Sequence, residues 1–185
     1  MMLIITILFV IALWLAHLAV GRSDALTLHI SQMRSLTVFA HCLFILLIGA
    51  AVCFARRARQ ERHDLSAVLG VAIAFSIFGA WLTPTVSRVH DLLASSPFIL
   101  LFLYVPIMLL HGGHFLAACL TFIVPPICNM LLWLAAGGSS GQLQKLNALL
   151  FLALLNFLYY RVLPATHPLL HPPYLDGRKP RLTGG

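Results

Sequence analysis

The chain has 185 residues, of which 61% are hydrophobic and 9% are charged, and its formal net charge is +7. An ordinary soluble domain has roughly 25% charged residues, and a chain of this length has too little interior to hide so much apolar surface. The composition excludes a soluble globular protein, and it excludes nucleic-acid binding because no soluble domain is left to carry a basic surface. We predict one all-α domain, a polytopic integral membrane helical bundle that faces the lipid bilayer.

Apolar segments follow one another along residues 1–163. A helix needs about 20 apolar residues to cross a hydrocarbon layer of ~30 Å, and each segment is close to that length. We predict about six transmembrane helices, with five as the alternative, and no soluble domain. The predicted spans cover residues 3–20, 36–55, 65–86, 92–110, 115–136 and 143–163.

The choice between five and six spans depends on the sequence HGGH at residues 111–114. Residues 92–136 would form a helix far longer than the bilayer is thick, at a rise of 1.5 Å per residue. Glycine is costly inside a helix but cheap in a turn, so Gly112 and Gly113 suit a turn between two spans. We predict that HGGH is this turn, which gives six spans.

The distribution of Lys and Arg predicts the orientation, because short basic loops stay on the cytoplasmic or matrix side. Six spans with both termini inside place eight of the 12 basic residues on the inner side. The inner residues are Arg56, Arg57, Arg59, Arg62, Arg161, Arg178, Lys179 and Arg181, and the outer ones are Arg22, Arg34, Arg88 and Lys145. We expect a bacterial inner (plasma) membrane or a mitochondrial inner membrane.

The last segment, residues 164–185, is a proline-rich basic tail. It lacks the apolar residues needed to fold alone. The sequence leaves two readings open, an extended arm that lies along a neighbouring subunit or an unstructured tail.

The chain has nine histidines, and two of them lie near the outer ends of the first two spans. His17 and His41 are at matched depth on neighbouring helices, as the two axial ligands of a b-type haem must be. Copper is a second hypothesis, with His17, His41 and His90 as ligands, because imidazole suits copper. The alternative is that each ring hydrogen-bonds to a neighbouring helix.

His111 and His114 form a second candidate metal site, to which we add His90 as a further candidate ligand. Residues three apart on a helix share a face, so the first two could bind one ion. HGGH resembles an H-G-x-H element in a transmembrane helix of subunit III of haem–copper oxidases. That family has a buried acidic residue in an earlier helix and this chain has none in any span, so we do not assign the chain to it.

Small residues and prolines mark places where helices can pack closely or break. Gly49, Gly70 and Gly79 would allow close helix contact in the second and third spans. Pro125 and Pro126 remove two backbone donors from the fifth span. Broken membrane helices can build a binding site, and they can also simply shape the packing.

Three functions remain after this reading. The acidic residues lie in loops or at span ends, which argues against a proton or cation pump and leaves no paired carboxylates for catalysis. We predict first a non-catalytic subunit of a larger membrane complex, energy-transducing, respiratory or transport-related, with other membrane subunits as partners. The alternatives are a redox or cofactor-handling protein that binds haem b or copper, and a small-molecule-binding component of a transporter.

Overall fold

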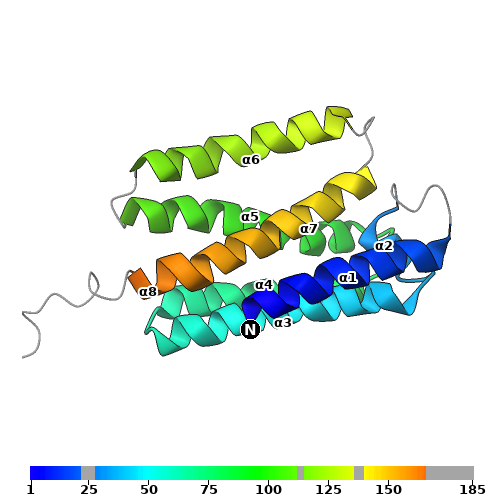
Figure 1. Ribbon diagram of the computed structural model, residues 1–185, viewed down its shortest axis with the longest axis horizontal. Helices are drawn as coiled ribbons and strands as arrows, with labels where there is room; N and C mark the ends of the chain where they lie inside the picture. The colour runs from blue at the N-terminus through cyan, green and yellow to red at the C-terminus, as the bar shows by residue number, and fades with distance from the viewer. Residues whose placement is uncertain (22–27, 112–114, 136–139, 166–185) are drawn as a thin grey trace, which may run out of the picture.

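A computed structural model gives the arrangement of the helices (Figure 1) and describes residues 1–21, 28–111, 115–135 and 140–165. All regular secondary structure in these residues is helical. The elements are α1 (Met2–Val20), α2 (Ile30–Met33), α3 (Val38–Gln60), α4 (Asp64–Leu82), α5 (Arg88–His111), α6 (Phe115–Ala135), α7 (Ser140–Phe157), the π-helical turn η1 (Leu158–Val162) and α8 (Leu163–Ala165).

Five helices, α1, α3, α4, α5 and α7 with its extension through η1, are long and apolar enough to cross a membrane. Helix α6 adds a shorter apolar helix over Phe115–Leu131. The predicted all-α membrane bundle is therefore confirmed. Helix α5 ends at His111 and α6 begins at Phe115. The predicted turn covers 111–114, of which His111 belongs to α5 and residues 112–114 lie outside the described residues, as does nearly all of the C-terminal tail.

Local signals explain where several helices begin and end. Gly21 ends α1 in the left-handed conformation, with φ 62°, which glycine adopts without steric cost. The Oγ1 of Thr37 accepts a hydrogen bond from the Phe39 amide at the start of α3. The Oγ of Ser87 likewise accepts from the His90 amide at 3.1 Å, so α5 begins before the predicted span.

The helices lie side by side along the long axis of the molecule, with α6 at the periphery next to α5 (Figure 1). The closest approach is between α3 and α4. A Cβ atom placed on Gly70 would lie 2.8 Å from the Cβ of Ala55 and 3.0 Å from the carbonyl oxygen of Ala51. This glycine therefore permits the tight packing that the sequence predicted, whereas Gly49 has nothing within 4 Å of such an atom.

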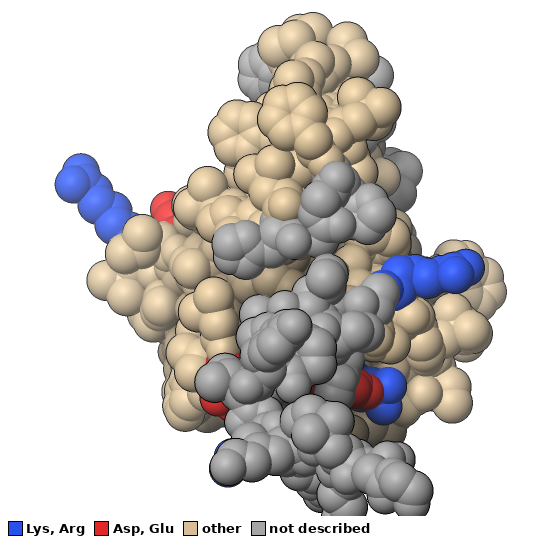
Figure 2. Space-filling view, turned by 90° about the vertical axis from the view of Figure 1, so that its left-hand side faces the viewer, with Lys and Arg blue, Asp and Glu red and all other residues tan. Residues whose placement is uncertain are grey.

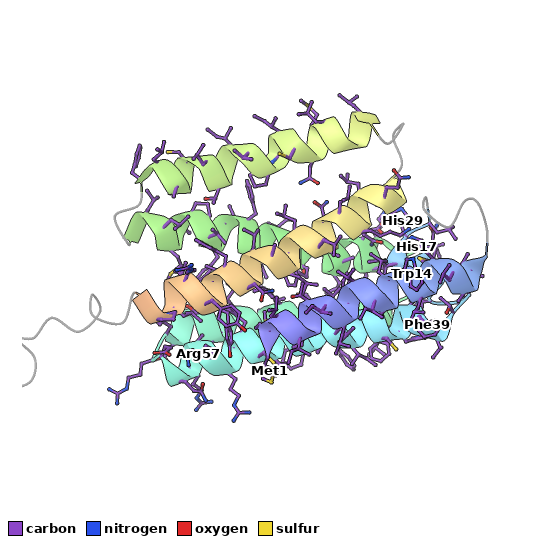
Figure 3. The ribbon with its side chains drawn as sticks, in the orientation of Figure 1. Met1, Trp14, His17, His29, Phe39 and Arg57 are labelled. Carbon is purple, nitrogen blue, oxygen red and sulfur yellow. The ribbon has the colours of Figure 1, made fainter. Side chains whose placement is uncertain are left out.

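The two ends of the bundle differ in chemistry. One end carries His17 and His29, and the other carries Arg57 (Figure 3). We call the first the histidine end. The second, the arginine end, is defined by Arg56, Arg57, Arg59, Arg62 and Arg161. Figure 2 looks onto the arginine end, where Lys and Arg side chains project from the rim. Arg57 pairs with Glu61 and lies 5.9 Å from the ring centre of Tyr159.

Candidate ligand-binding site at the histidine end

A lysine and a histidine join the first and last long helices at the histidine end. The Nζ of Lys145 on α7 donates a hydrogen bond to the Nε2 of His17 on α1 at 3.0 Å. The His17 ring also hydrogen-bonds to the backbone of Leu13 one turn earlier. Lys145 is only 6% exposed. Ionisable residues inside a membrane bundle cost free energy and are retained for a structural or functional reason. The Lys145–His17 pair therefore makes the histidine end a candidate functional site.

The short helix α2 is fastened to α7 by Gln144. Its Oε1 accepts a hydrogen bond from the Ile30 amide at 2.7 Å, and its side chain also hydrogen-bonds to His29. Burial lowers the pKa of the His29 ring below its ordinary value of 6.5, and the charge of Lys145 acts in the same direction. The Gln144 bond and the Asp91 carboxylate oppose this shift without reversing it. The structure therefore favours the neutral form of His29.

His90 is the most deeply buried of these histidines, at 3% exposed. Its Nδ1 lies 2.8 Å from the carbonyl oxygen of Ala80 and 3.3 Å from the Oγ1 of Thr83. A carbonyl oxygen can only accept, so Nδ1 carries the proton and donates it to Ala80. In the neutral ring the lone pair then resides on Nε2, which makes that atom a hydrogen-bond acceptor.

A polar cavity of about 340 Å³ opens between α2, α5 and α7. Hydrogen-bonding side chains dominate its lining, in contrast to the apolar bundle around it. The lining residues are His29, Ser31, Gln32, Thr85, His90, Asp91, Ala94, Ser95, Phe98, Leu143, Gln144 and Asn147. Because these residues come from helices far apart in the sequence, only the folded bundle forms this cavity.

Two apolar cavities adjoin the polar one. A small cavity of about 50 Å³ lies behind it and shares His90, Ala94, Phe98 and Gln144 with it. A side cavity of about 220 Å³ lies between α5, α6 and α7 and shares Phe98 and Asn147 with the polar cavity. Phe98 lines all three, so the cavities meet around this ring.

The two predicted haem ligands are both engaged by protein groups. The indole Nε1–H of Trp81 donates to the Nδ1 of His41 at 3.0 Å, which places the His41 proton on Nε2. The Nε2 of His17 accepts from Lys145. Iron ligation through either Nε2 would require a tautomer change or the loss of a hydrogen bond. Both rings take part in hydrogen bonds between helices, and the haem and copper hypotheses stay predictions.

Two other candidate metal ligands belong to α5. His90 lies near the start of this 24-residue helix and His111 is its last residue. His114 lies outside the described residues, so the pair of His111 and His114 stays a prediction. Among the described residues no group of three or more His, Cys, Asp or Glu side chains is placed to hold a metal ion.

Sequence reasoning missed three members of this region. From the sequence alone, Lys145 is one of the outer basic residues, and neither Gln144 nor His29 stands out. The available signal was their position: Gln144 and Lys145 fall inside the predicted span 143–163, where a basic residue is expensive. The partners of these residues lie more than 100 positions away in the chain, so no local pattern identifies them.

No protein-family model matches the sequence, and neither the curated proteins nor the solved structures include a significant match. The function of the protein is therefore inferred from the geometry of the histidine end.

Proposed function

We propose that the protein is a ligand-binding membrane protein, the small-molecule-binding component of a transport-related system. The observation that carries this proposal is the polar cavity between α2, α5 and α7. Its volume of about 340 Å³ is within the ~300–1,000 Å³ typical of small-molecule sites. The cavity is open, with Asp91 and Ser95 exposed, so a ligand could enter it and exchange hydrogen bonds with its polar lining.

The lining combines imidazole, carboxamide, hydroxyl and carboxylate groups. Such a set favours a molecule with several hydrogen-bonding groups over a purely apolar one. The contacts that fix the walls, between His90 and Ala80 and between Gln144 and Ile30, hold the cavity in shape without a ligand. This preorganisation reduces the entropy lost on binding.

The test is the identity of small molecules that co-purify with the protein in mild detergent. Ala94 lines the polar cavity, so Ala94→Trp would fill it. Ala153 is exposed on α7, and Ala153→Trp serves as the matched control. Mass spectrometry of the extracted molecules should find one that is retained by wild type and by Ala153→Trp and lost from Ala94→Trp. Equal retention by all three proteins would contradict the proposal.

A second candidate function is a non-catalytic subunit of a larger membrane complex. The observation that favours it is the peripheral position of α6, whose large apolar side chains are mostly exposed. A peripheral membrane helix has a free face on which helices of other subunits can pack through van der Waals contact. Stable recovery of other membrane proteins with this chain in mild detergent, at a constant ratio, would support this role. Recovery of the chain alone would count against it.

The orientation is also a proposal. The arginine end would face the cytoplasm or matrix, since basic residues concentrate on that side. The histidine end, with the polar cavity, would then face the outside. Single cysteines at Ser35 (histidine end) and at Arg59 (arginine end) would test this with a membrane-impermeant thiol reagent in a background without the native cysteines. Labelling of Arg59→Cys from the outside would reverse the assignment.

A further inference from the structure

We propose that the ligand is a neutral single-chain amphiphile, with a hydrogen-bond-donating head in the polar cavity and its chain in the side cavity between α5, α6 and α7. This inference rests on the proposed function and specifies the chemical class of the ligand. It follows from the way in which the two cavities join and from the groups that line each one.

The two cavities share Phe98 and Asn147, from which we infer one path along the same faces of α5 and α7. On α5, Asp91, Ser95 and Phe98 line the polar cavity, and Phe102 continues the row into the side cavity. The spacing of three and four residues keeps these positions on one helix face. The path therefore runs lengthwise through the bundle and does not cross it.

The same progression appears on α7. Gln144 lines the polar cavity, Asn147 lines both cavities, and Leu150 and Leu154 line the side cavity. From Gln144 to Leu154 the helix rises by about 15 Å at 1.5 Å per residue. The lining changes from polar to apolar over this length, which matches a molecule that is polar at one end only.

Two groups in the polar part of the path can accept hydrogen bonds from a ligand. In its uncharged form the His90 ring presents Nε2 as an acceptor, because Nδ1 donates to Ala80. The carboxylate of Asp91, also in the lining, accepts only. An acidic head would be repelled by this carboxylate, whereas hydroxyl or amide donors would be satisfied. The charge of Lys145, which acts on the lining residue His29, would repel a cationic head, so the head of the ligand should be neutral and donate hydrogen bonds.

The side cavity holds a further acceptor. The Nδ2 of Asn129 on α6 donates to the carbonyl oxygen of Pro125 at 3.0 Å, which fixes the orientation of the carboxamide. Its Oδ1 is buried and has no hydrogen-bond partner among the described residues. Asn129 and Asn147 both line the side cavity. A buried acceptor without a donor costs about 1–3 kcal/mol, so a donor on the ligand would be favoured here.

The prolines of α6 strengthen this acceptor character. Pro125 and Pro126 line the side cavity and have no backbone N–H. The carbonyl groups of Thr121 and Phe122, four residues earlier, thus lose their usual helical donors. The remaining lining is apolar and aromatic, as an alkyl chain requires.

Three probes separate the contributions of head and chain. They are 1-monolauroylglycerol, which has hydroxyl donors and a long chain, 1-monobutyrylglycerol, which has the same head and a short chain, and methyl laurate, which has the chain without donors. Native mass spectrometry of the detergent-purified protein would measure the fraction of chains carrying one probe. We expect 1-monolauroylglycerol to bind at least 10-fold more tightly than either of the others.

Variants locate the chain and head. Leu150 is 37% exposed and lines the side cavity, while Leu146, one turn earlier on α7, is 38% exposed and is not part of that lining. Leu150→Trp should weaken 1-monolauroylglycerol binding at least 10-fold, and Leu146→Trp should leave it unchanged. Asn129→Leu should weaken it about 3- to 10-fold, as expected for one lost hydrogen bond, and should not affect methyl laurate.

The outcomes separate this inference from the proposed function. Equal binding of the short- and long-chain glycerol esters, unaffected by Leu150→Trp, would overturn the amphiphile and leave a polar ligand in the polar cavity. Binding of no probe, together with a co-purifying molecule lost in Ala94→Trp, would also overturn the amphiphile while the proposed function stands. Binding of no probe and no such molecule would overturn both.

Discussion

Lys145 and His17 lie 128 positions apart in the chain, and their Nζ and Nε2 atoms are 3.0 Å apart where α7 meets α1. This hydrogen bond connects the last long helix to the first. Around it, Gln144 and His29 join α7 to α2, so the polar groups of the histidine end connect helices from both ends of the chain.

The first prediction concerns this pair. His17→Leu and Lys145→Met should each lower the free energy of unfolding by about 1–3 kcal/mol, because each leaves a buried polar group without this partner. The double variant should lose less than the sum of the two. Thermal unfolding in detergent would measure the double-mutant cycle. Strictly additive losses would show that the two side chains do not interact.

Packing of α3 against α4 gives the second prediction. Gly70→Ala would place a Cβ atom 2.8 Å from the Cβ of Ala55 and should cost about 1–3 kcal/mol of stability. Gly49→Ala is the matched control, because its Cβ would have no neighbour within 4 Å. This control should gain up to about 1 kcal/mol from helix propensity. A Gly70→Ala protein as stable as Gly49→Ala would contradict the close approach.

Stability should depend on pH through His29. Its pKa in the fold is lowered below 6.5, so the unfolded chain binds a proton more readily than the folded one. The stability contributed by the neutral ring is fully present above pH 6.5 and is lost as the pH falls through the lower folded pKa. Unfolding temperatures measured between pH 8 and pH 5 should therefore fall less steeply in His29→Gln than in wild type. The same pH dependence of the unfolding temperature in both proteins would contradict a lowered pKa of His29.

The indole of Trp81 holds His41 by its N–H group and stacks on Phe44 with ring centres 6.4 Å apart. Trp81→Phe would keep an aromatic ring and remove the donor. We expect a loss of about 1 kcal/mol, the usual net contribution of one hydrogen bond. His41→Leu should cost a similar amount, and the double variant should not cost twice as much. Full additivity here would mean that the contact contributes nothing.

An absorption spectrum distinguishes haem ligation by His17 and His41 from hydrogen bonding of these rings to neighbouring helices. Rings held by Lys145 and Trp81 predict a flat spectrum in the visible range for the oxidised and dithionite-reduced protein. A reduced α-band typical of b-type haem, lost in His17→Ala or His41→Ala, would contradict the hydrogen-bonded arrangement and support the haem hypothesis.

Much of the fold could be predicted from the sequence because apolar segments of span length are local signals. The all-α membrane bundle follows from composition and segment length alone. The small residue Gly70 was also recognisable, since close helix packing needs the absence of a Cβ atom. Helix α2 could not be predicted, because four residues have too little propensity and depend on the Gln144 contact.

The candidate site was less predictable, for a physical reason. The sequence marked His17, His41 and His90 as notable but gave no partners, because hydrogen bonds between helices depend on the rotation of each helix. The partner of His17 proved to be Lys145, and that of His41 proved to be Trp81. Cavities arise from gaps between non-neighbouring helices, so no sequence pattern reports them.

The most direct test of the ligand site is photocrosslinking in native membranes. Ser95 is exposed and lines the polar cavity. Ala153 is also exposed but lies outside that lining. A diazirine amino acid would replace each residue in turn, and intact-protein mass spectrometry would follow irradiation. The account predicts one adduct of defined mass at position 95 that is absent at 153. No adduct at 95, or the same adducts at both positions, would contradict it.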